Sequence, residues 1–336
     1  MLLLLKKQNL DRKIMTINIL MVGYAQQTQN ARQIKILQSL GANVIMLDPY
    51  GTNGQYATIQ WQGEQVIWQD QDISPSQIGA VLVCAQAPDM PTEEAFRTNE
   101  HRHLNWEGWF QHYGLQRDRS DTLLSLLLMY EQAGIPMFNP PSQTLLSRRK
   151  PYQIRQLQTA GCRLPASLVT NNPIEAKRFI EEYGDCIIKP AAGGSLTLSA
   201  NQLLEQGALD KLSIAPAIVQ QRINGDDLRI VVVNDAVVSC AAVGVPEGTI
   251  DFRGEQSYQQ GKISYKEVSL PHLVELQCRR AASLLGLRYT GIDIKHTANN
   301  EYYMLECNSS PIYLDVEYKL KHPITEALCM ALIQAS

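Results

Sequence analysis

Two pairs of apolar runs, each joined by a two-residue turn, constrain the fold more than any other feature of the sequence. The first pair is 228–233 with 236–242, and the second pair is 290–295 with 302–307. The connecting dipeptides are Asn234-Asp235 and Asn299-Asn300. Asparagine and aspartate tolerate the positive φ angles of tight hairpin turns, so both pairs predict antiparallel hairpins. The hairpins disfavour a single doubly wound sheet over the whole chain.

The first third of the chain has the pattern of a βαβ unit. The run Ile17–Val22 ends at Gly23, and a helical pattern from Ala31 to Leu40 ends at Gly41. Further apolar runs at 44–47 and 81–84 predict two more strands. We therefore expect an α/β unit followed by α+β units. The predicted boundaries are 1–14 for an extra N-terminal segment, 15–145 for the α/β domain, 146–222 for a small domain and 223–336 for a larger one.

Four later helices are predicted from periodicity and end signals. The spacing predicts helices over 123–132, 151–160, 173–183 and 273–285. Asp121 is expected to cap the first of these helices, and Asn172 and Gly184 to bound the third. The polar stretch 88–119 has no clean periodicity and receives no element.

Composition excludes several classes of function. The chain has 30 Lys+Arg against 33 Asp+Glu, for a net charge of -3, which does not fit electrostatic binding of nucleic acid. It contains no apolar stretch of the ~20 residues that a membrane span needs. The seven cysteines are scattered, and most lie in apolar runs, so we expect core thiols in a reducing, cytoplasmic compartment.

The second hairpin carries the main chemical signal. With the turn at Asn299-Asn300, Asp293 lies opposite Glu306, and Asn308 shares their face. Two carboxylates directly opposite repel each other, and a cation between them would remove that cost. Two carboxylates and an amide suit a hard ion such as Mg²⁺. The alternative is a solvated polar face with Lys295 as counter-ion. In this register Leu305 falls opposite Ile294 on the apolar face.

Signals for phosphate binding are weaker. The sequence has no P-loop and no dinucleotide fingerprint. Lys189 ends the predicted strand 186–189 and precedes the small-residue loop 190–195, an arrangement that either reaches a phosphate or is only a loop. Asp227 and Arg229 alternate at a strand start, and Arg253 lies in a loop. Taken singly, each is better explained as a surface ion-pair residue than as a site residue.

In order along the chain, these motifs resemble the RimK-like branch of the ATP-grasp superfamily over roughly residues 140–335. The match is strongest at Gly291-Ile292-Asp293-Ile294 and at 304–311, which reads Met-Leu-Glu-Cys-Asn-Ser-Ser-Pro. The segments 225–229 and 251–253 resemble the branch's GxDxR and DFR motifs. The resemblance implies an ATP-grasp fold behind an α/β pre-ATP-grasp domain, with ATP and two Mg²⁺ ions as cofactors and Mn²⁺ as an alternative ion.

Residue roles follow from the resemblance position by position. It implies that Asp293, Glu306 and Asn308 hold the metals and that Arg229 and Arg253 act in catalysis. The nucleotide-binding residues that it implies are Lys150, Lys189, Gly193, Gly194, Ser195, Gln220, Gln221, Arg222, Ile223 and Asp227. One departure stands at the interdomain hinge, where Gln221 replaces the family's acid and Arg222 follows. Without that acid, a side-chain acceptor for the base or ribose of the nucleotide is in doubt at this position. A strict preference for ATP is therefore in doubt as well.

The resemblance implies a carboxylate–amine ligase that forms an acyl phosphate and releases ADP and phosphate. The expected substrates are an amino acid, a peptide or a protein, with no nucleic-acid or membrane partner; a homo-oligomer is left open. Segments 150–154 and 167–173 resemble graspetide synthetases, which cross-link side chains of a precursor peptide. The residues also leave open an ATP-grasp kinase, a non-catalytic ATP-binding module and a dinucleotide-dependent oxidoreductase, although the last lacks its glycine fingerprint.

Overall fold

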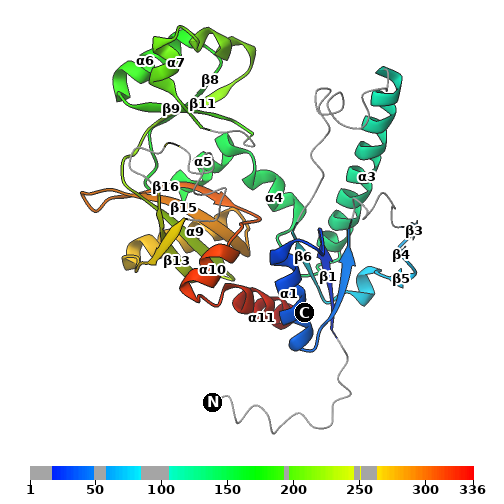
Figure 1. Ribbon diagram of the computed structural model, residues 1–336. Helices are drawn as coiled ribbons and strands as arrows, with labels where there is room; N and C mark the ends of the chain where they lie inside the picture. The colour runs from blue at the N-terminus through cyan, green and yellow to red at the C-terminus, as the bar shows by residue number, and fades with distance from the viewer. Residues whose placement is uncertain (1–16, 49–57, 85–105, 193–196, 246–249, 251–262) are drawn as a thin grey trace.

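The computed structural model describes residues 17–48, 58–84, 106–192, 197–245, 250 and 263–336 (Figure 1). Within these ranges the chain forms three main sheets and one small one. The N-terminal segment 1–14 lies outside the described residues. In the part of the chain that is described, no helix combines the length and apolar character that crossing a membrane requires.

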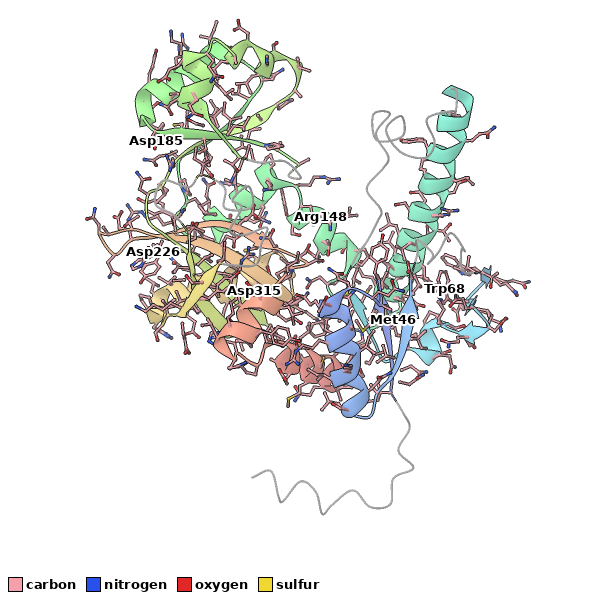
Figure 2. The ribbon with its side chains drawn as sticks, viewed as in Figure 1. Met46, Trp68, Arg148, Asp185, Asp226 and Asp315 are labelled. Atoms are coloured by element: carbon pink, nitrogen blue, oxygen red, sulfur yellow. The ribbon has the colours of Figure 1, made fainter. Side chains whose placement is uncertain are left out.

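The first sheet is parallel, with the order β2-β1-β6-β7. Its strands are β1 (Asn18–Val22), β2 (Asn43–Leu47), β6 (Ala80–Val83) and β7 (Met137–Phe138). Helix α1 (Thr28–Ser39) connects β1 to β2, which confirms the predicted βαβ unit. A small antiparallel sheet of β3 (Ile59–Gln62), β4 (Gln65–Trp68) and β5 (Gln71–Asp72) adjoins it. Figure 2 shows Met46 and Trp68 on this part of the molecule.

Helix α3 (Trp106–Gln132) differs most from the sequence prediction. It begins well before Leu123, so Asp121 lies inside the helix and does not cap it. The carbonyl oxygen of Asp121 instead accepts a hydrogen bond from Ser125 Oγ at 2.7 Å. Figure 1 shows the N-terminal half of α3 extending away from the sheets. A helix segment that is not packed against a core has no need of an apolar stripe, so periodicity did not reveal it.

The second sheet is antiparallel, with the order β10-β9-β11-β8. Its strands are β8 (Ser167–Thr170), β9 (Cys186–Pro190), β10 (Leu198–Ser199) and β11 (Ala217–Gln221). It packs on α6 (Pro173–Tyr183) and α7 (Ala200–Glu205). The predicted ends of α6 are confirmed, because Asn172 accepts a hydrogen bond from the Ile174 amide and Gly184 has a φ of 76°. Helices α4 (Pro141–Ser147) and α5 (Lys150–Thr159) precede this sheet.

The third sheet is also antiparallel, with the order β14-β13-β12-β15-β16. Its strands are β12 (Asp226–Val233), β13 (Ala236–Gly244), β14 (Ser264–Glu267), β15 (Tyr289–His296) and β16 (Tyr302–Asn308). Both predicted hairpins are present, and Asn234 and Asp235 have the expected positive φ angles of 43° and 65°. Helix α9 (His272–Leu284) packs with α5 on one face of this sheet.

The C-terminal helices join the first and third sheets. They are α10 (Leu314–Leu320) and α11 (Ile324–Ala335). Leu328 and Leu332 of α11 pack in one core with Leu82 of β6 and Val231 of β12. The buried carboxylate of Glu317 in α10 pairs with Arg32 of α1 and accepts hydrogen bonds from Thr325. The strands of each main sheet lie within one predicted domain. Helix α11, however, belongs to the last predicted domain and packs against the first sheet. The domain boundaries therefore stay a prediction.

The cysteines are core residues, as the sequence predicts. All seven are free thiols, and all except the partly exposed Cys84 are buried.

Candidate active site

A cavity of about 1000 Å³ lies between the second and third sheets. Its walls come from β9 and β11 on one side, from β12, β13, β15 and β16 on the other, and from the linker 222–225 between them. Asp185 and Asp226, which both line the cavity, lie on these two parts of the molecule in Figure 2. The volume is at the upper end of the usual range for small-molecule sites, about 300–1,000 Å³.

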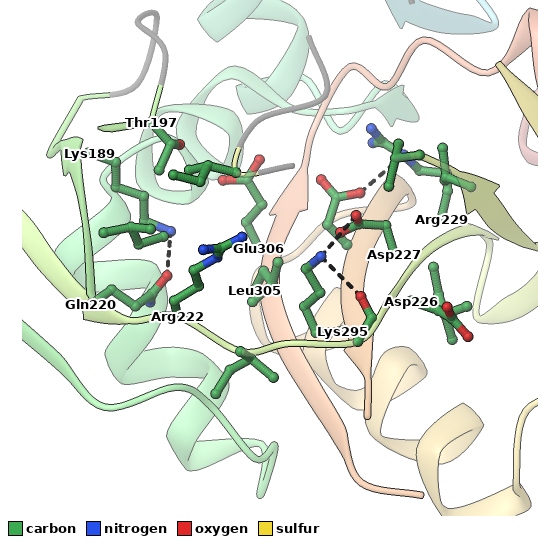
Figure 3. A pocket seen from close by; sticks show the side chains of 18 of the residues that line it. Lys189, Thr197, Gln220, Arg222, Asp226, Asp227, Arg229, Lys295, Leu305 and Glu306 are labelled. Atoms are coloured by element: carbon green, nitrogen blue, oxygen red, sulfur yellow. Dashed lines mark hydrogen bonds and ion pairs between the residues drawn. The ribbon is translucent and has the colours of Figure 1, made fainter. Parts of the chain in front are cut away.

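The structure brings together all the predicted site residues that it describes. The residues that line this one cavity are Lys150, Lys189, Gln220, Gln221, Arg222, Ile223, Asp227, Arg229, Asp293, Glu306 and Asn308. Gly193, Gly194, Ser195 and Arg253 lie outside the described residues. Figure 3 shows Lys189 and Gln220 of the second sheet on one side of the cavity and Glu306, Asp227, Arg229 and Lys295 of the third sheet on the other.

The hairpin of β15 and β16, which carries both carboxylates, has the predicted pairing of Asp293 with Glu306, but its turn and register differ from the prediction. Asp293 is opposite Glu306, and Asn308 is opposite Gly291. The turn is one residue longer than predicted, because Thr297 pairs with Glu301 and leaves 298–300 as the loop. A bulge then takes up the extra residue, since Ile294 is opposite Met304 and not Leu305. The predicted burial of Leu305 against the core is therefore wrong: Leu305 lines the cavity (Figure 3).

Each carboxylate of this hairpin is paired with a cation. Lys150 Nζ lies 2.7 Å from Glu306 Oε2, and Arg229 Nε lies 3.0 Å from Asp293 Oδ1. Two positions further along β12 and β15, Asp227 is opposite Lys295, and Lys295 Nζ lies 2.9 Å from Asp227 Oδ2. These six charges balance within the described part of the site, so it holds little net charge before a ligand enters.

The two central carboxyl groups have different acidities. Burial raises the pKa of Asp293 to about 6, and the neighbouring Glu306 and Asp227 charges add to the rise, against the opposing effect of Arg229. Burial acts on Glu306 in the same sense. The Lys150 ammonium outweighs it, with help from Lys189, and holds the pKa of Glu306 below its ordinary value. Asp293 is therefore the carboxylate that would gain most from an added cation.

These residues fit a divalent metal. The donor set consists of carboxylate and amide oxygens, which hard ions such as Mg²⁺ prefer. Asn308 lies within the same set, because its Nδ2 donates to Asp293 Oδ2 at 3.1 Å. Burial is the main cause of the raised pKa of Asp293, so its charged form is poorly solvated, and a cation at this position would stabilise it.

Lys189 lies across the cavity from the hairpin. Its Nζ donates to Gln220 Oε1 at 2.9 Å, and Gln220 Nε2 donates in turn to Ser167 Oγ at 2.8 Å. Gln220 is buried between these two partners. The two strands β9 and β11 therefore hold the lysine ammonium in the cavity, where its charge helps to lower the pKa of Glu306 on the facing wall.

The hinge residues are tied to the protein through their backbone. The amide of Gln221 donates to the Ala166 carbonyl at 2.9 Å, and that of Arg222 donates to the Asp185 carbonyl at 2.8 Å. The Arg222 guanidinium also lies 3.3 Å from the Asp185 carboxylate. Any contact from the hinge to a bound base must therefore use groups other than these two amides.

Several residues of the cavity were not predicted as site residues. Asp185 and the segment 310–312 line it, and Lys295 was considered only as a counter-ion. Gln29 of α1 holds the segment 310–312, donating to the Pro311 carbonyl at 3.2 Å and accepting from the Tyr313 amide at 3.0 Å. Contacts between residues this distant in sequence leave no local signal. The Ser-Ser-Pro sequence after Asn308 was the one available hint.

Comparisons with known proteins agree with this geometry. The RimK-like ATP-grasp domain family matches residues 146–332. The chain is similar to the ATP-grasp ligase PsnB complexed with minimal precursor, with 30% identity and a TM-score of 0.78 over 95% of this chain and 98% of that chain. PsnB complexed with minimal precursor, Mg and ADP is 31% identical, with a TM-score of 0.77 over 94% and 96% of the two chains.

A more distant structure shares the fold. The macrocyclase MdnC bound with precursor peptide MdnA from Microcystis aeruginosa MRC is 18% identical, with a TM-score of 0.73 over 95% of this chain and all of that one. No curated protein matches the chain by sequence.

Proposed function

Because the chain belongs to the RimK-like ATP-grasp family and is an ATP-grasp ligase, we propose that its substrate is a peptide, one carboxylate of which it activates with ATP. The observation that carries the ATP-dependent activation is the cavity in which Asp293, Glu306, Lys150 and Lys189 converge. It supplies cations for phosphates and oxygen ligands for metal ions in one place. Phosphoryl transfer depends on such positioning and charge neutralisation.

We assign the residues as follows. Asp293, Glu306 and Asn308 hold two Mg²⁺ ions, which would neutralise charge on the transferred phosphoryl group. Lys150 and Lys189 bind phosphate oxygens of ATP from opposite sides of the cavity. Arg229, which holds Asp293 through Nε, stabilises the substrate carboxylate or the oxyanion that develops from it.

The proposed reaction has two stages. An oxygen of the substrate carboxylate attacks the γ-phosphorus of ATP, the bond to the bridging oxygen breaks, and ADP leaves. A hydroxyl or amine then attacks the carbonyl carbon of the acyl phosphate, phosphate leaves, and the nucleophile loses its proton. The peptide loses one water for each ester or amide bond formed.

The likeness to PsnB supports a peptide as the source of both reacting groups. At 29–31% identity over 94–95% of this chain, three PsnB structures are described as complexes with a minimal precursor or a variant of it. A ligase that joins a free amino acid to a small molecule would need the same ATP site, so the cavity does not separate the two. The full-length match to peptide-bound structures favours intramolecular cross-linking of a precursor peptide.

The test combines product analysis with a chemical trap. The protein is incubated with Mg²⁺, ATP and peptides that carry both acidic and hydroxyl or amine side chains, beginning with any short peptide encoded beside its gene. We expect ADP and phosphate, never AMP, and a peptide that has lost water. Hydroxylamine should convert the acyl phosphate into a hydroxamate, and Asp293→Asn should release neither product. A stable phosphopeptide without hydroxamate would indicate a kinase, and ATP binding without any release would indicate a binding module.

A further inference from the structure

Strand β16 is the edge strand of the third sheet, so its outward backbone groups need partners from outside the sheet. The side chain of Gln153 on α5 supplies two of them. Gln153 Nε2 donates to the Cys307 carbonyl at 2.9 Å, and the Cys307 amide donates to Gln153 Oε1 at 3.0 Å. One side-chain amide therefore stands where the backbone of a neighbouring strand would stand.

This amide is fully engaged and shielded from water. Gln153 is 4% exposed, and its Nε2 also donates to the Ser147 carbonyl at the end of α4 at 2.6 Å. A buried amide with both donors and its acceptor satisfied fixes the orientation of the element that carries it. Gln153 thus fixes α5 against β16 and against α4 at the same time.

The bridged position lies at the centre of the site. Cys307 stands between Glu306 and Asn308 on β16, with its own side chain in the core. Lys150 precedes Gln153 by three residues on α5, a spacing that places both side chains on one face of the helix. From that face Lys150 reaches Glu306 at 2.7 Å, next to the backbone that Gln153 holds.

We propose that Gln153 is a positioning residue for the ligase reaction, which sets Lys150 against Glu306 by bridging α5 to the backbone of Cys307. Gln153 is not among the residues that line the cavity, so it acts through those that do. The proposal rests on the function assigned above to Lys150 and Glu306. Its geometric content, that loss of the bridge moves Lys150 away from Glu306, stands independently of which reaction the protein catalyses.

The test compares Gln153→Met with Gln33→Met. Gln33 is also a buried amide, 1% exposed, but it lies on α1 and donates to the Tyr313 hydroxyl at 3.0 Å. Both variants lose a buried hydrogen-bonded amide of the same size, so both are expected to melt at lower temperature than the wild type. Assays are run where both remain folded by circular dichroism.

Two readouts separate positioning from stability. We expect kcat for ATP turnover to fall roughly tenfold in Gln153→Met, with a smaller change in KM for ATP, while Gln33→Met keeps wild-type kcat. We also expect labelling of Lys150 by an amine-reactive reagent, followed by mass spectrometry, to rise in Gln153→Met alone. If Gln153→Met does not fold, Gln153→Asn replaces it, because it keeps the amide but is too short to bridge.

Equal kcat in the two glutamine variants, or unchanged labelling of Lys150, would overturn the proposal. If the wild-type protein turns over no ATP with any peptide, the proposed function fails, and the labelling comparison alone decides whether Gln153 positions Lys150.

Discussion

Replacement of Gly225 by alanine tests how closely the hinge must approach the hairpin of β15 and β16. Gly225 lies in the linker between the second and third sheets, at a φ of 157°, and lines the cavity. A Cβ at this position would lie 2.7 Å from the carbonyl carbon of His296 and 3.0 Å from Cα of Thr297, and nearer still to the His296 oxygen. The neighbours are backbone atoms of the hairpin, so no side chain can turn aside.

The size of the effect follows from that geometry. An ordinary contact begins at 3.4 Å, so the linker must move by about 0.7 Å or more away from β15. Forced overpacking of this kind costs about 1–3 kcal/mol of stability. The movement also stretches the bond from Lys295 Nζ to the Gly225 carbonyl, now 3.2 Å, and displaces Arg222 in the cavity wall. A displacement approaching 1 Å costs up to ~100-fold in function, and we expect roughly tenfold weaker binding of ATP.

The assay is urea unfolding together with calorimetric titration of a non-hydrolysable ATP analogue. Gly207→Ala is the control, because Gly207 also has a positive φ, 64°, but its Cβ would meet nothing within 4 Å. That variant should lose stability, by about 1–2 kcal/mol from backbone strain, and keep its ATP affinity. If Gly225→Ala binds the analogue as tightly as Gly207→Ala does, the close approach has no bearing on the nucleotide site and the reasoning is refuted.

Three further predictions concern charge and protonation. Glu306→Gln should abolish ATP turnover and weaken the binding of Mg²⁺ with nucleotide. Its melting temperature should stay within a few degrees of the wild-type value, because Lys150, which loses its charged partner, is 25% exposed and can be solvated. Wild-type turnover in this variant would exclude Glu306 from the proposed metal site. Lys189→Met should weaken ATP binding at least tenfold, about 1.4 kcal/mol, in a calorimetric titration, and unchanged affinity would leave Lys189 without a phosphate role. Burial raises the pKa of each of the Cys84, Cys240 and Cys329 thiols from 9.0 to about 12. These thiols ionise at lower pH in the unfolded chain than in the folded protein. The free energy of unfolding should therefore be unaffected below pH 9 and fall as the pH rises toward 12, by up to about 1.4 kcal/mol per pH unit for each thiol. Urea unfolding at about pH 8 and pH 10 measures this loss, and an equal loss in a variant with all three cysteines replaced by alanine would contradict the prediction.

Local sequence signals predicted the elements whose ends carry a capping or turn residue. Asn172 and Gly184 bound α6, and Asn234-Asp235 closes the first hairpin, as expected. Helix α3 was predicted only over its last turns, because none of the described side chains in its first half is buried, so that half needs no apolar face. Periodicity reports burial, so a helix segment with little burial escapes it.

The candidate site could be predicted to the extent that it lies on regular strands. Period-two spacing placed Asp293, Glu306 and Asn308 on one face of their hairpin. Asp227 and Arg229 also alternate on one strand, β12, but only the family resemblance linked them to Asp293, which faces them from β15. Asp185 and Gln153 escaped notice because their roles depend on contacts across the fold. Asp185 meets Arg222 across 37 positions of sequence, and Gln153 meets Cys307 across 154. No local pattern encodes such contacts.

The bulge at Leu305 shows how a correct prediction can rest on an incomplete argument. A two-residue turn with regular strands and a three-residue loop with one bulge both place Asp293 opposite Glu306, so the pairing could not distinguish them. Only the second arrangement turns Leu305 toward the cavity beside Glu306, two consecutive residues that a regular strand would send to opposite faces. The bulge therefore places an apolar side chain next to a carboxylate in the same wall, which suits a ligand with an apolar base at one end and phosphates at the other. The sequence feature that lengthens the loop, Asn300 with its φ of 60°, thus shapes the site from the far end of the hairpin.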